Sequence, residues 1–307
     1  SLQAKNTTKE QIIMGTATFR ATLTNGQYKK GNFTDKDGSV YEGIHVFTTL
    51  NRRNQRIIPL VSTENEVELS SMNPNSNIAQ PSDVIAKING NVFVSNSCPV
   101  GFNYEGAGGN FYAGKWVYQA APDLGSDNKS AYKNPKFSPS FCVKSNGDAI
   151  IRWFSSKEKL QIAMDACDCI IAGAHALVFD GKCVLDEEVY DAETDSLLIY
   201  SLDGDGYQAA TRWDTSVTAS GSTKVSQRTC LGHKSGSNGI YMMVCTDAAI
   251  TLRTAARLME CLGCDYAVNL DGNGSVQMRI KNGYGASGKV TSGVGRTIFA
   301  GVAAYLV

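Results

Sequence analysis

The sequence predicts an α+β fold of mixed α/β character, in which strands outnumber helices. Short apolar runs bounded by glycine, asparagine and proline recur along most of the 307 residues, a pattern typical of strands. Apolar residues at helical spacing occur over 155–166 and 251–263. Hydrophobic residues make up 42% of the chain and charged residues 19%, as in ordinary globular proteins. We therefore expect a strand-rich mixed sheet with a few helices.

The charge balance argues against a highly charged partner. Lys+Arg and Asp+Glu both number 29, so no net field draws the chain to nucleic acid or to an anionic membrane. No apolar run approaches the roughly 20 residues of a membrane-spanning helix, and the polar N-terminus does not resemble a signal peptide. The sequence leaves the oligomeric state and the cellular compartment open.

The cysteine pattern predicts buried thiols rather than a disulfide framework. The nine cysteines are an odd number, and most lie within apolar strand-like runs. Reduced thiols would suit an intracellular site. The lone CxxC at Cys261 and Cys264 has no second pair and no neighbouring histidine, so we predict no zinc site there.

The N-terminal region is predicted to be rich in strands. Candidate strands cover 14–23, 41–47 and 57–61, and Asn25-Gly26 is a strong hairpin signal. The polar segment 62–83 is predicted to be a long loop. We accordingly divide the chain into a β-rich portion, 1–80, packed on a main domain, 81–307.

The first polar feature of the main domain is Asn89-Gly90-Asn91. It lies inside a predicted strand, 84–94, where a glycine indicates a bulge or a close backbone approach. Asn89 could bind a sugar hydroxyl or a phosphate oxygen, or could simply stabilise the bulge. Further predicted elements are a hairpin over 141–154 and a buried strand over 168–179, which contains His175 but supplies no orienting partner for it.

The most informative part of the sequence is a strand, helix and strand that end in a polar loop. The strands are predicted over 239–246 and 266–270, with a helix over 251–263 capped by Thr251 and stopped by Gly263. In a β-crossover-β unit the strands would be parallel, with Asp247 and Asp271 at the same edge. Small ligands usually bind at such an edge, and we place the candidate site there.

The loop that follows Asn269 concentrates polar groups. Asp271, Asn273 and Ser275 alternate with glycines, which allow the backbone to turn sharply and a ligand to approach it. Such a loop could bind an anion, a sugar or a cation, or be only a polar turn between strands. The spacing also mimics the start of a calcium loop, although no distal glutamate follows, and Asp203 and Asp205 could hold a cation too. We predict no required cofactor, with calcium as a minor alternative.

This loop resembles the Asn-Leu-Asp-Gly-Gly-Gly-Ser signature of the phosphodiester glycosidase family. Three other blocks resemble family motifs in the same order, and together the four cover roughly residues 80–307. They are the Asn-Gly block from Ile88 to Phe93, the Arg-Thr-x-x-Gly block from Gln227 to Gly232, and the closing strand from Gly295 to Val302.

The resemblance implies hydrolysis of a sugar-1-phosphodiester in a glycan, a nucleotide-sugar or a cell-envelope polymer. A guanidinium would hold the phosphate and a carboxylate would act on the sugar. The implied catalytic residues are Asp271, Asp247 and Arg228. The implied substrate-binding residues are Asn89, Gly90, Thr229, Asn269, Gly272, Asn273, Gly274, Ser275 and Arg296.

The resemblance leaves a second reading of the function open. Asn273 and Asn91 stand where the family has glycine, which favours a non-catalytic glycan-binding module, such as a phage tail or cell-surface component. The family itself suggests a cell-surface, secreted or phage-particle location.

Overall fold

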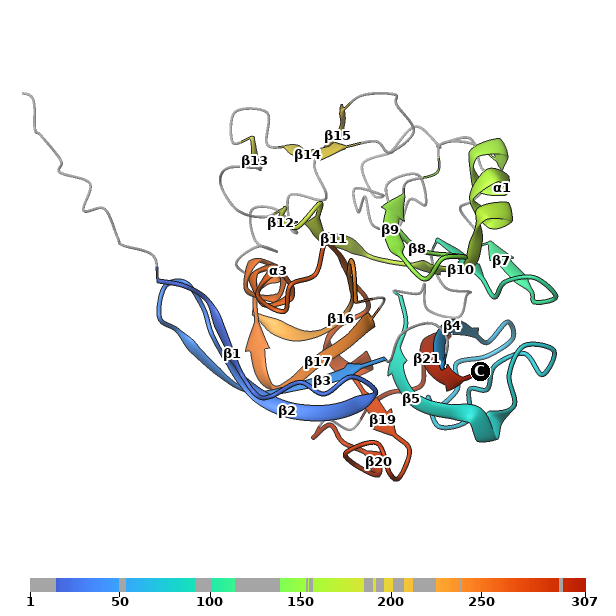
Figure 1. Cartoon of the computed structure of the whole chain (residues 1–307), viewed down its shortest axis with the longest axis horizontal. Coiled ribbons are helices and arrows are strands. Elements are labelled where there is room, and N and C mark those ends of the chain that lie inside the picture. The colour runs from blue at the N-terminus through green and yellow to red at the C-terminus, as the bar shows by residue number, and fades with distance from the viewer. Residues whose placement is uncertain are drawn as a thin grey trace, which may run out of the picture.

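The structure is a computed structural model, and many more of its described residues lie in strands than in helices (Figure 1). It describes residues 15–49, 54–91, 101–113, 139–152, 154, 157–184, 190–191, 196–200, 207–211, 225–237, 239–292 and 295–307. The cation candidates Asp203 and Asp205 lie outside these residues. Two α-helices are described, α1 (Lys157–Ala166) and α3 (Leu252–Cys261).

The largest sheet has eight strands in the order β1-β2-β3-β17-β16-β18-β11-β12. Every neighbouring pair in it is antiparallel. The strands are β1 (Thr18–Arg20), β2 (Gln27–Thr34), β3 (Val40–Thr48), β11 (His175–Phe179), β12 (Lys182–Cys183), β16 (Ser226–Lys234), β17 (Gly239–Ile250) and β18 (Tyr266–Asn269).

Two five-stranded sheets and a three-stranded sheet complete the described strands. The order β20-β19-β5-β21-β4 joins β4 (Gln55–Val61), β5 (Val84–Asn89), β19 (Met278–Ile280), β20 (Gly288–Lys289) and β21 (Ala300–Leu306). The order β7-β6-β10-β8-β9 joins β6 (Phe102–Tyr104), β7 (Phe111–Ala113), β8 (Ser140–Lys144), β9 (Ala149–Arg152) and β10 (Cys167–Ala172). The small sheet contains β13 (Tyr190–Asp191), β14 (Ser196–Tyr200) and β15 (Tyr207–Thr211). Short 3-10 turns are η1 (Pro81–Asp83) and η3 (Asn273–Ser275).

The predicted strand-helix-strand unit is present as β17, α3 and β18, with one difference. β17 and β18 run in the same direction, as predicted, because both are antiparallel to β16. They are not neighbours, since β16 lies between them and pairs with both. The two carboxyl ends still reach one edge of the sheet, where β16 begins.

The single strand predicted over 168–179 is wrong, because the segment divides into β10 and β11, which belong to different sheets. The break falls at Gly173, whose N–H donates to the carbonyl oxygen of Pro139 at 2.8 Å. A Cβ at Gly173 would lie 2.9 Å from Cβ of Val268. A glycine therefore lets the chain pass close to β18 and change sheets.

The strands of the first 80 residues are built into the two large sheets. β3 pairs with β17, and β4 pairs with β21. The strand predicted over 14–23 is shorter in the structure, where β1 covers Thr18–Arg20. Gly26 adopts φ +76° in the predicted turn before β2. The domain boundary near residue 80 stays a prediction.

The eight-stranded sheet separates two hydrophobic clusters. One packs α3 against the sheet and includes Cys230, Cys245 and Met259. The other fills the space between this sheet and both five-stranded sheets, and includes Leu231, Val244 and residues of β5, β10 and β21. Alternate residues of β16 and β17 therefore face opposite clusters.

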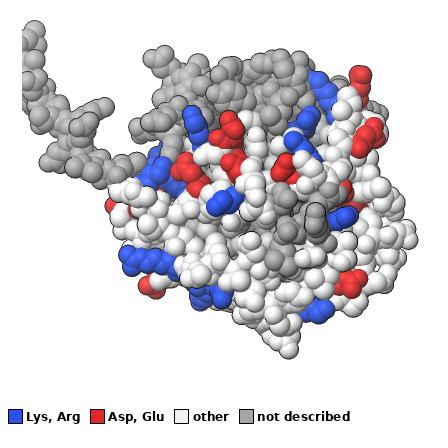
Figure 2. Space-filling model, in the orientation of Figure 1, with Lys and Arg blue, Asp and Glu red and all other residues white. Residues whose placement is uncertain are grey.

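The described cysteines agree with the prediction of buried thiols. Eight form no disulfide, and Cys261 is the one among them that is only partly buried. Charged residues of both signs are interspersed on the face that Figure 2 shows, in keeping with the balanced composition. In the described part of the chain, no helix has the length and apolar character needed to cross a membrane.

Candidate active site at the Asp271 loop

Asn89, at the end of β5, connects three of the sequence blocks. Its Nδ2 donates to the carbonyl oxygen of Asp271 at 2.8 Å, and its Oδ1 accepts from Thr229 Oγ1 at 2.6 Å. The same Oδ1 accepts from the backbone N–H of Gln277 at 3.1 Å. Because Asn89 is only 1% exposed, these bonds are shielded from water and hold the loop after β18 against β5 and β16.

Gly90 allows a close approach of backbones beside the loop. Its N–H donates to the carbonyl oxygen of Ala300 at 2.7 Å, and its own carbonyl accepts from the N–H of Asp271 at 2.9 Å. A Cβ at this position would lie 2.7 Å from the carbonyl carbon of Ala300. The sequence needs glycine here for packing, as the strand pattern predicted.

Arg296 reaches the loop from the segment before β21. Its Nη2 lies 3.2 Å from Asp271 Oδ2, and its Nε donates to Ser275 Oγ at 2.8 Å. Asp271 Oδ1 accepts from the N–H of Gly272 at 2.9 Å. The Asp271 side chain is 14% exposed and that of Arg296 is 55% exposed, so this charge pair is open to solvent on the arginine side.

The loop oxygens that suggested a calcium site face protein donors. Asp271 and Ser275 accept from Arg296, and Asn273 Oδ1 accepts from Ser226 Oγ at 2.5 Å. Among the described residues, no three His, Cys, Asp or Glu side chains are grouped so as to hold a metal ion. The charge that compensates Asp271 is therefore a guanidinium.

Two loop residues have conformational requirements. Asn273 adopts φ +53°, a left-handed conformation that asparagine tolerates better than most residues other than glycine. Gly272 packs against β16, since a Cβ there would lie 2.8 Å from the carbonyl oxygen of Gln227. Gly274 accepts from the N–H of Arg296 at 2.9 Å through its carbonyl oxygen.

Arg228 and Thr229 are adjacent in β16 but point to opposite faces of the sheet. Thr229 faces Asn89, whereas Arg228 Nε donates to the carbonyl oxygen of Ile250, just before α3, at 3.2 Å. Arg228 is 9% exposed, and burial lowers the pKa of its guanidinium. Burial also lowers the pKa of His175 to about 3, and the charge of Arg228 adds to that shift.

Asn269 lies on the same face of the sheet as Arg228. In the register of the sheet it pairs with Cys230 on β16 and with His175 on β11. Its Nδ2 donates to the carbonyl oxygen of Leu270 at 2.6 Å, while its buried Oδ1 has no hydrogen-bond partner in the described part of the chain. A buried acceptor without a donor is unfavourable.

Asp247 lies at the same edge of the sheet within its own polar cluster. Its carboxylate contacts Lys30 Nζ at 2.6 Å and Ser292 Oγ at 2.5 Å. Burial raises the pKa of Asp247, but the hydrogen bonds from Lys30, Ser292 and Thr246 outweigh it and hold the pKa well below its usual range. His45 Nε2 lies 3.8 Å from the carboxylate. Asp247 is thus an anion at neutral pH.

Gln227 and Ser226 connect the polar cluster around Asp247 with the Asp271 loop. Gln227 Nε2 donates to the carbonyl oxygen of Thr246 at 3.0 Å, next to Asp247. Ser226 bonds the Asp271 loop through Asn273. The start of β16 therefore lies between Asp247 and the loop.

Several residues of this region carry no signal in the sequence. Gln277 Nε2 donates to the carbonyl oxygen of Arg296 at 3.1 Å, and its backbone bonds Asn89. Lys30 and Ser292 reach Asp247 from distant parts of the chain. No local pattern in the sequence distinguishes these three residues from polar residues on the surface.

The fold of this chain resembles those of solved structures. It is similar to the catalytic domain of zebrafish N-acetylglucosamine-1-phosphodiester alpha-N-acetylglucosaminidase, autoinhibited by its pro-peptide, with a TM-score of 0.60 and 12% identity over 94% of this chain and 86% of that chain. A hypothetical protein from Synechocystis matches with a TM-score of 0.50 and 11% identity over 92% of this chain and 62% of that chain. At such identities the likeness concerns the fold.

The sequence establishes the family. The phosphodiester glycosidase family model matches residues 82–302, and the chain belongs to this family. Among curated proteins, none matches the chain.

Proposed function

We propose that this protein hydrolyses a glycosyl phosphodiester at the Asp271 loop. The observation that carries the proposal is the hydrogen-bonded junction at Asn89, which ties the Asn-Gly block to Thr229 and to the Asp271 loop. Family membership supports the reaction class. The combination of carboxylate, guanidinium and amide groups suits a substrate with a phosphate and a sugar.

The proposed reaction separates the sugar from the phosphate. Water forms a bond to the glycosyl carbon as the bond from that carbon to the phosphate oxygen breaks. The phosphate leaves with the electron pair, and the proton of the attacking water passes to a carboxylate and then to solvent. The transition state has oxocarbenium character, so a nearby carboxylate stabilises it.

Asp271 is our first choice for that carboxylate, and the two arginines are candidates to hold the phosphate. Arg296 already contacts Asp271 and remains 55% exposed at its side chain, so a phosphate can approach its guanidinium. Arg228 is more deeply buried and would add positive charge behind the site. A phosphate on Arg296 would weaken the Asp271–Arg296 pair and free the carboxylate for the sugar.

Asp247 is the second candidate carboxylate. Lys30 and Ser292 keep it ionised and hold its pKa well below the usual range, which suits electrostatic stabilisation better than proton transfer. Asn89, Asn269, Thr229, Ser275 and the backbone from Gly272 to Gly274 would shape the site around the substrate.

The test is a substrate screen with matched variants. The wild-type protein is incubated with UDP-sugars, teichoic-type polymers and sugar-1-phosphodiesters in water labelled with oxygen-18, and products are identified by mass. We expect the label in the sugar. Asp271→Asn should lower the rate at least about 100-fold, because the variant lacks the charge that stabilises the transition state.

Asp265→Asn is the matched control, because Asp265 precedes the opposite end of β18 and its carboxylate accepts from the N–H of Ser235. It should retain the wild-type rate. An Asp271→Asn protein with full activity would remove the role of Asp271. Saccharide binding in a calorimeter with no product from any substrate would instead identify a glycan-binding module.

A further inference from the structure

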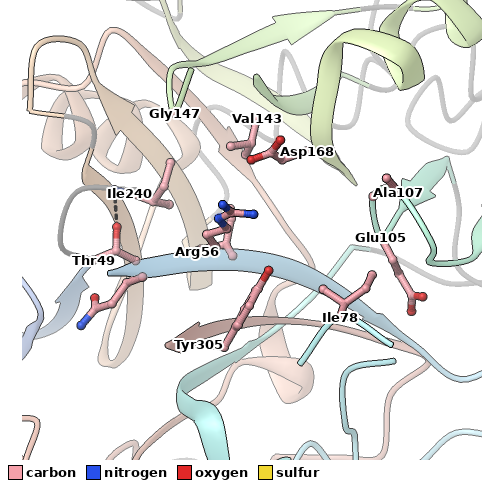
Figure 3. A pocket seen from close by; sticks show the side chains of 13 residues that line it. Thr49, Arg56, Ile78, Glu105, Ala107, Val143, Gly147, Asp168, Ile240 and Tyr305 are labelled. Carbon is pink, nitrogen blue, oxygen red and sulfur yellow. Dashed lines mark hydrogen bonds between the residues drawn. The ribbon is translucent and has the colours of Figure 1, made fainter. Parts of the chain in front are cut away.

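A polar cavity lies away from the Asp271 loop. It has a volume of about 150 Å³, and its walls include Arg56 from β4, Tyr305 from β21 and Asp168 from β10. Thr49 and Glu105 add further polar groups (Figure 3), as does Gln55. A space of this size accepts a molecule about as large as a single sugar ring.

The cavity and the loop lie toward opposite ends of the same strands. Ile240, near the start of β17, lines the cavity, whereas Asp247 is near the other end of that strand. On β21, Tyr305 near the end of the strand lines the cavity, whereas Ala300 at its start contacts Gly90 beside the loop. At about 3.3 Å per residue, the two regions of β17 are roughly 20 Å apart. The cavity is therefore separate from the proposed active site.

Arg56 is the central charged group of this cavity. Among the residues that the structure describes, its Nε has no hydrogen-bond partner and its guanidinium forms no ion pair, while the guanidinium is hydrogen-bonded to the Tyr305 side chain. A guanidinium without a counter-charge can be compensated by an anion that a ligand supplies. The planar guanidinium is suited to an oxyanion that can accept two parallel hydrogen bonds.

Tyr305 provides a neighbouring hydroxyl. The residue is 6% exposed, and burial raises the pKa of its phenol to about 12. It therefore keeps its proton at neutral pH and can donate to a ligand oxygen. Figure 3 shows Arg56 and Tyr305 extending from neighbouring strands, with Asp168 above them.

Glu105 and Asp168, the two acidic residues of the cavity wall, differ in how they can contact a ligand. Both oxygens of Glu105 accept from protein groups: Oε2 from Asn75 Nδ2 at 3.2 Å and from the N–H of Asn110 at 2.8 Å, and Oε1 from the Tyr112 hydroxyl at 3.5 Å. Asp168 presents its carboxylate from β10, and a carboxylate has enough lone pairs to accept from ligand hydroxyls beside its other contacts.

The wall near Asp168 depends on a glycine. Gly106 adopts φ +105°, and a Cβ there would overlap the carbonyl oxygen of Asp168. Gly109 donates to the carbonyl oxygen of Gly106 at 3.0 Å and closes this turn. The loop is thus held close to β10, so the cavity is part of the folded structure rather than a gap between side chains.

We propose that this cavity binds a small molecule, about the size of a monosaccharide, that carries an oxyanion and neighbouring hydroxyl groups. The oxyanion contacts Arg56 and Tyr305, and hydroxyl groups contact Asp168 and the Gln55 side of the cavity. A sugar acid and a sugar phosphate share this chemistry. The site is independent of the reaction proposed at Asp271.

Titration calorimetry with glucuronate, glucose 6-phosphate and glucose tests the proposal. We expect saturable binding of at least one of the two anionic sugars to the whole protein, and binding of glucose at least ten-fold weaker. Which anion binds more tightly identifies the source of the oxyanion. Arg56→Gln should weaken binding at least ten-fold, and Tyr305→Phe, which keeps the ring, several-fold.

Asp271→Asn is the control, because it alters the other site and should leave this binding unchanged. Thermal melting checks that each variant folds. If Arg56→Gln does not fold, Tyr305→Phe tests the site. Failure of both anionic sugars to bind the wild-type protein would overturn the proposal. So would wild-type affinity in both cavity variants, or loss of binding in Asp271→Asn.

Discussion

At the scale of single residues, Asn89 uses its side chain to hold the protein together. Its Oδ1 accepts from Thr229 and Gln277, and its Nδ2 donates to Asp271 and, at 3.4 Å, to the carbonyl oxygen of Gly90. An amide has no strong hydrogen-bonding capacity left after these bonds. We therefore expect Asn89 to position the loop and Thr229, and to affect substrate through them.

Asn273 should be replaceable by glycine but not by alanine. Asn273 has a φ of +53°, in the left-handed region, where a Cβ is unfavourable and asparagine is tolerated better than alanine. Asn273→Ala should therefore destabilise the protein by about 1–2 kcal/mol. Asn273→Gly should cost less than about 0.5 kcal/mol, since glycine accepts this conformation. Urea denaturation measures both values.

Ser226→Ala is the control for this prediction, because it removes the hydrogen bond to Asn273 without changing the backbone of the loop. If the alanine and glycine variants at 273 are equally stable, the backbone conformation is not the cause.

His175 should make the protein less stable as the pH falls below 6.5. The unfolded state has the ordinary pKa of 6.5, while burial lowers the folded pKa to about 3. Between these values the unfolded state binds a proton that the folded state does not, so the free energy of unfolding falls as pH decreases. A difference of one bound proton changes the free energy of unfolding by at most about 1.4 kcal/mol per pH unit. Above pH 6.5 the contribution is complete.

Urea denaturation at several pH values between 4 and 8 measures this slope, and His175→Gln should make it shallower. His45 and His233 also have pKa values lowered by burial, so part of the slope should persist in the variant. An unchanged slope in His175→Gln would contradict the assignment.

At the scale of elements, helix α3 fixes the relation between β17 and β18. Thr251 caps it, with the side chain accepting from the N–H of Thr254 at 3.0 Å. One face of the helix, including Ala255, Leu258 and Met259, is fully buried against the eight-stranded sheet. The helix therefore connects the two strands that carry Asp247 and lead to Asp271.

Thr251→Ala should destabilise the protein by about 1 kcal/mol, because the first turn of α3 loses its capping acceptor. Thr251→Ser keeps a hydroxyl and should stay close to the wild type. Thermal and urea denaturation provide the comparison. Equal losses in both variants would show that the methyl group, not the cap, is important.

At the scale of the whole molecule, the first 80 residues contribute strands to two sheets. β3 lies between β2 and β17, and β4 is the edge strand beside β21. Their residues Ile44, Phe47 and Ile58 are completely buried. Removing these strands would expose the backbone of β17 and β21 together with both cores.

A chain of residues 81–307 should therefore not fold stably, although the family match begins at residue 82. We expect it to aggregate or to lack a cooperative melting transition, in contrast to the full chain. Circular dichroism and analytical size exclusion test this. A cooperative, monomeric 81–307 protein would support a separate domain beginning near residue 80.

Local sequence patterns determined much of the secondary structure and the position of the candidate loop. The helix at 251–263, the hairpin over 141–154 and the turn at Asn25-Gly26 depend on residues within a few positions of one another, so their signals are readable in the sequence. The same is true of the Asp271 loop, whose glycines and polar residues are adjacent. The division between β10 and β11 could not be predicted in this way. Glycine is required at position 173 because the backbone there passes close to Val268, which is distant in sequence.

Tertiary structure decided which distant groups meet. The bond between Asn89 and Thr229 spans 140 residues, the bond between Asn89 and Asp271 spans 182, and the bond between Lys30 and Asp247 spans 217. It also created the cavity around Arg56, which no motif marks. Sequence patterns report the conformational preferences of neighbours, whereas these contacts depend on the path of the whole chain through its sheets.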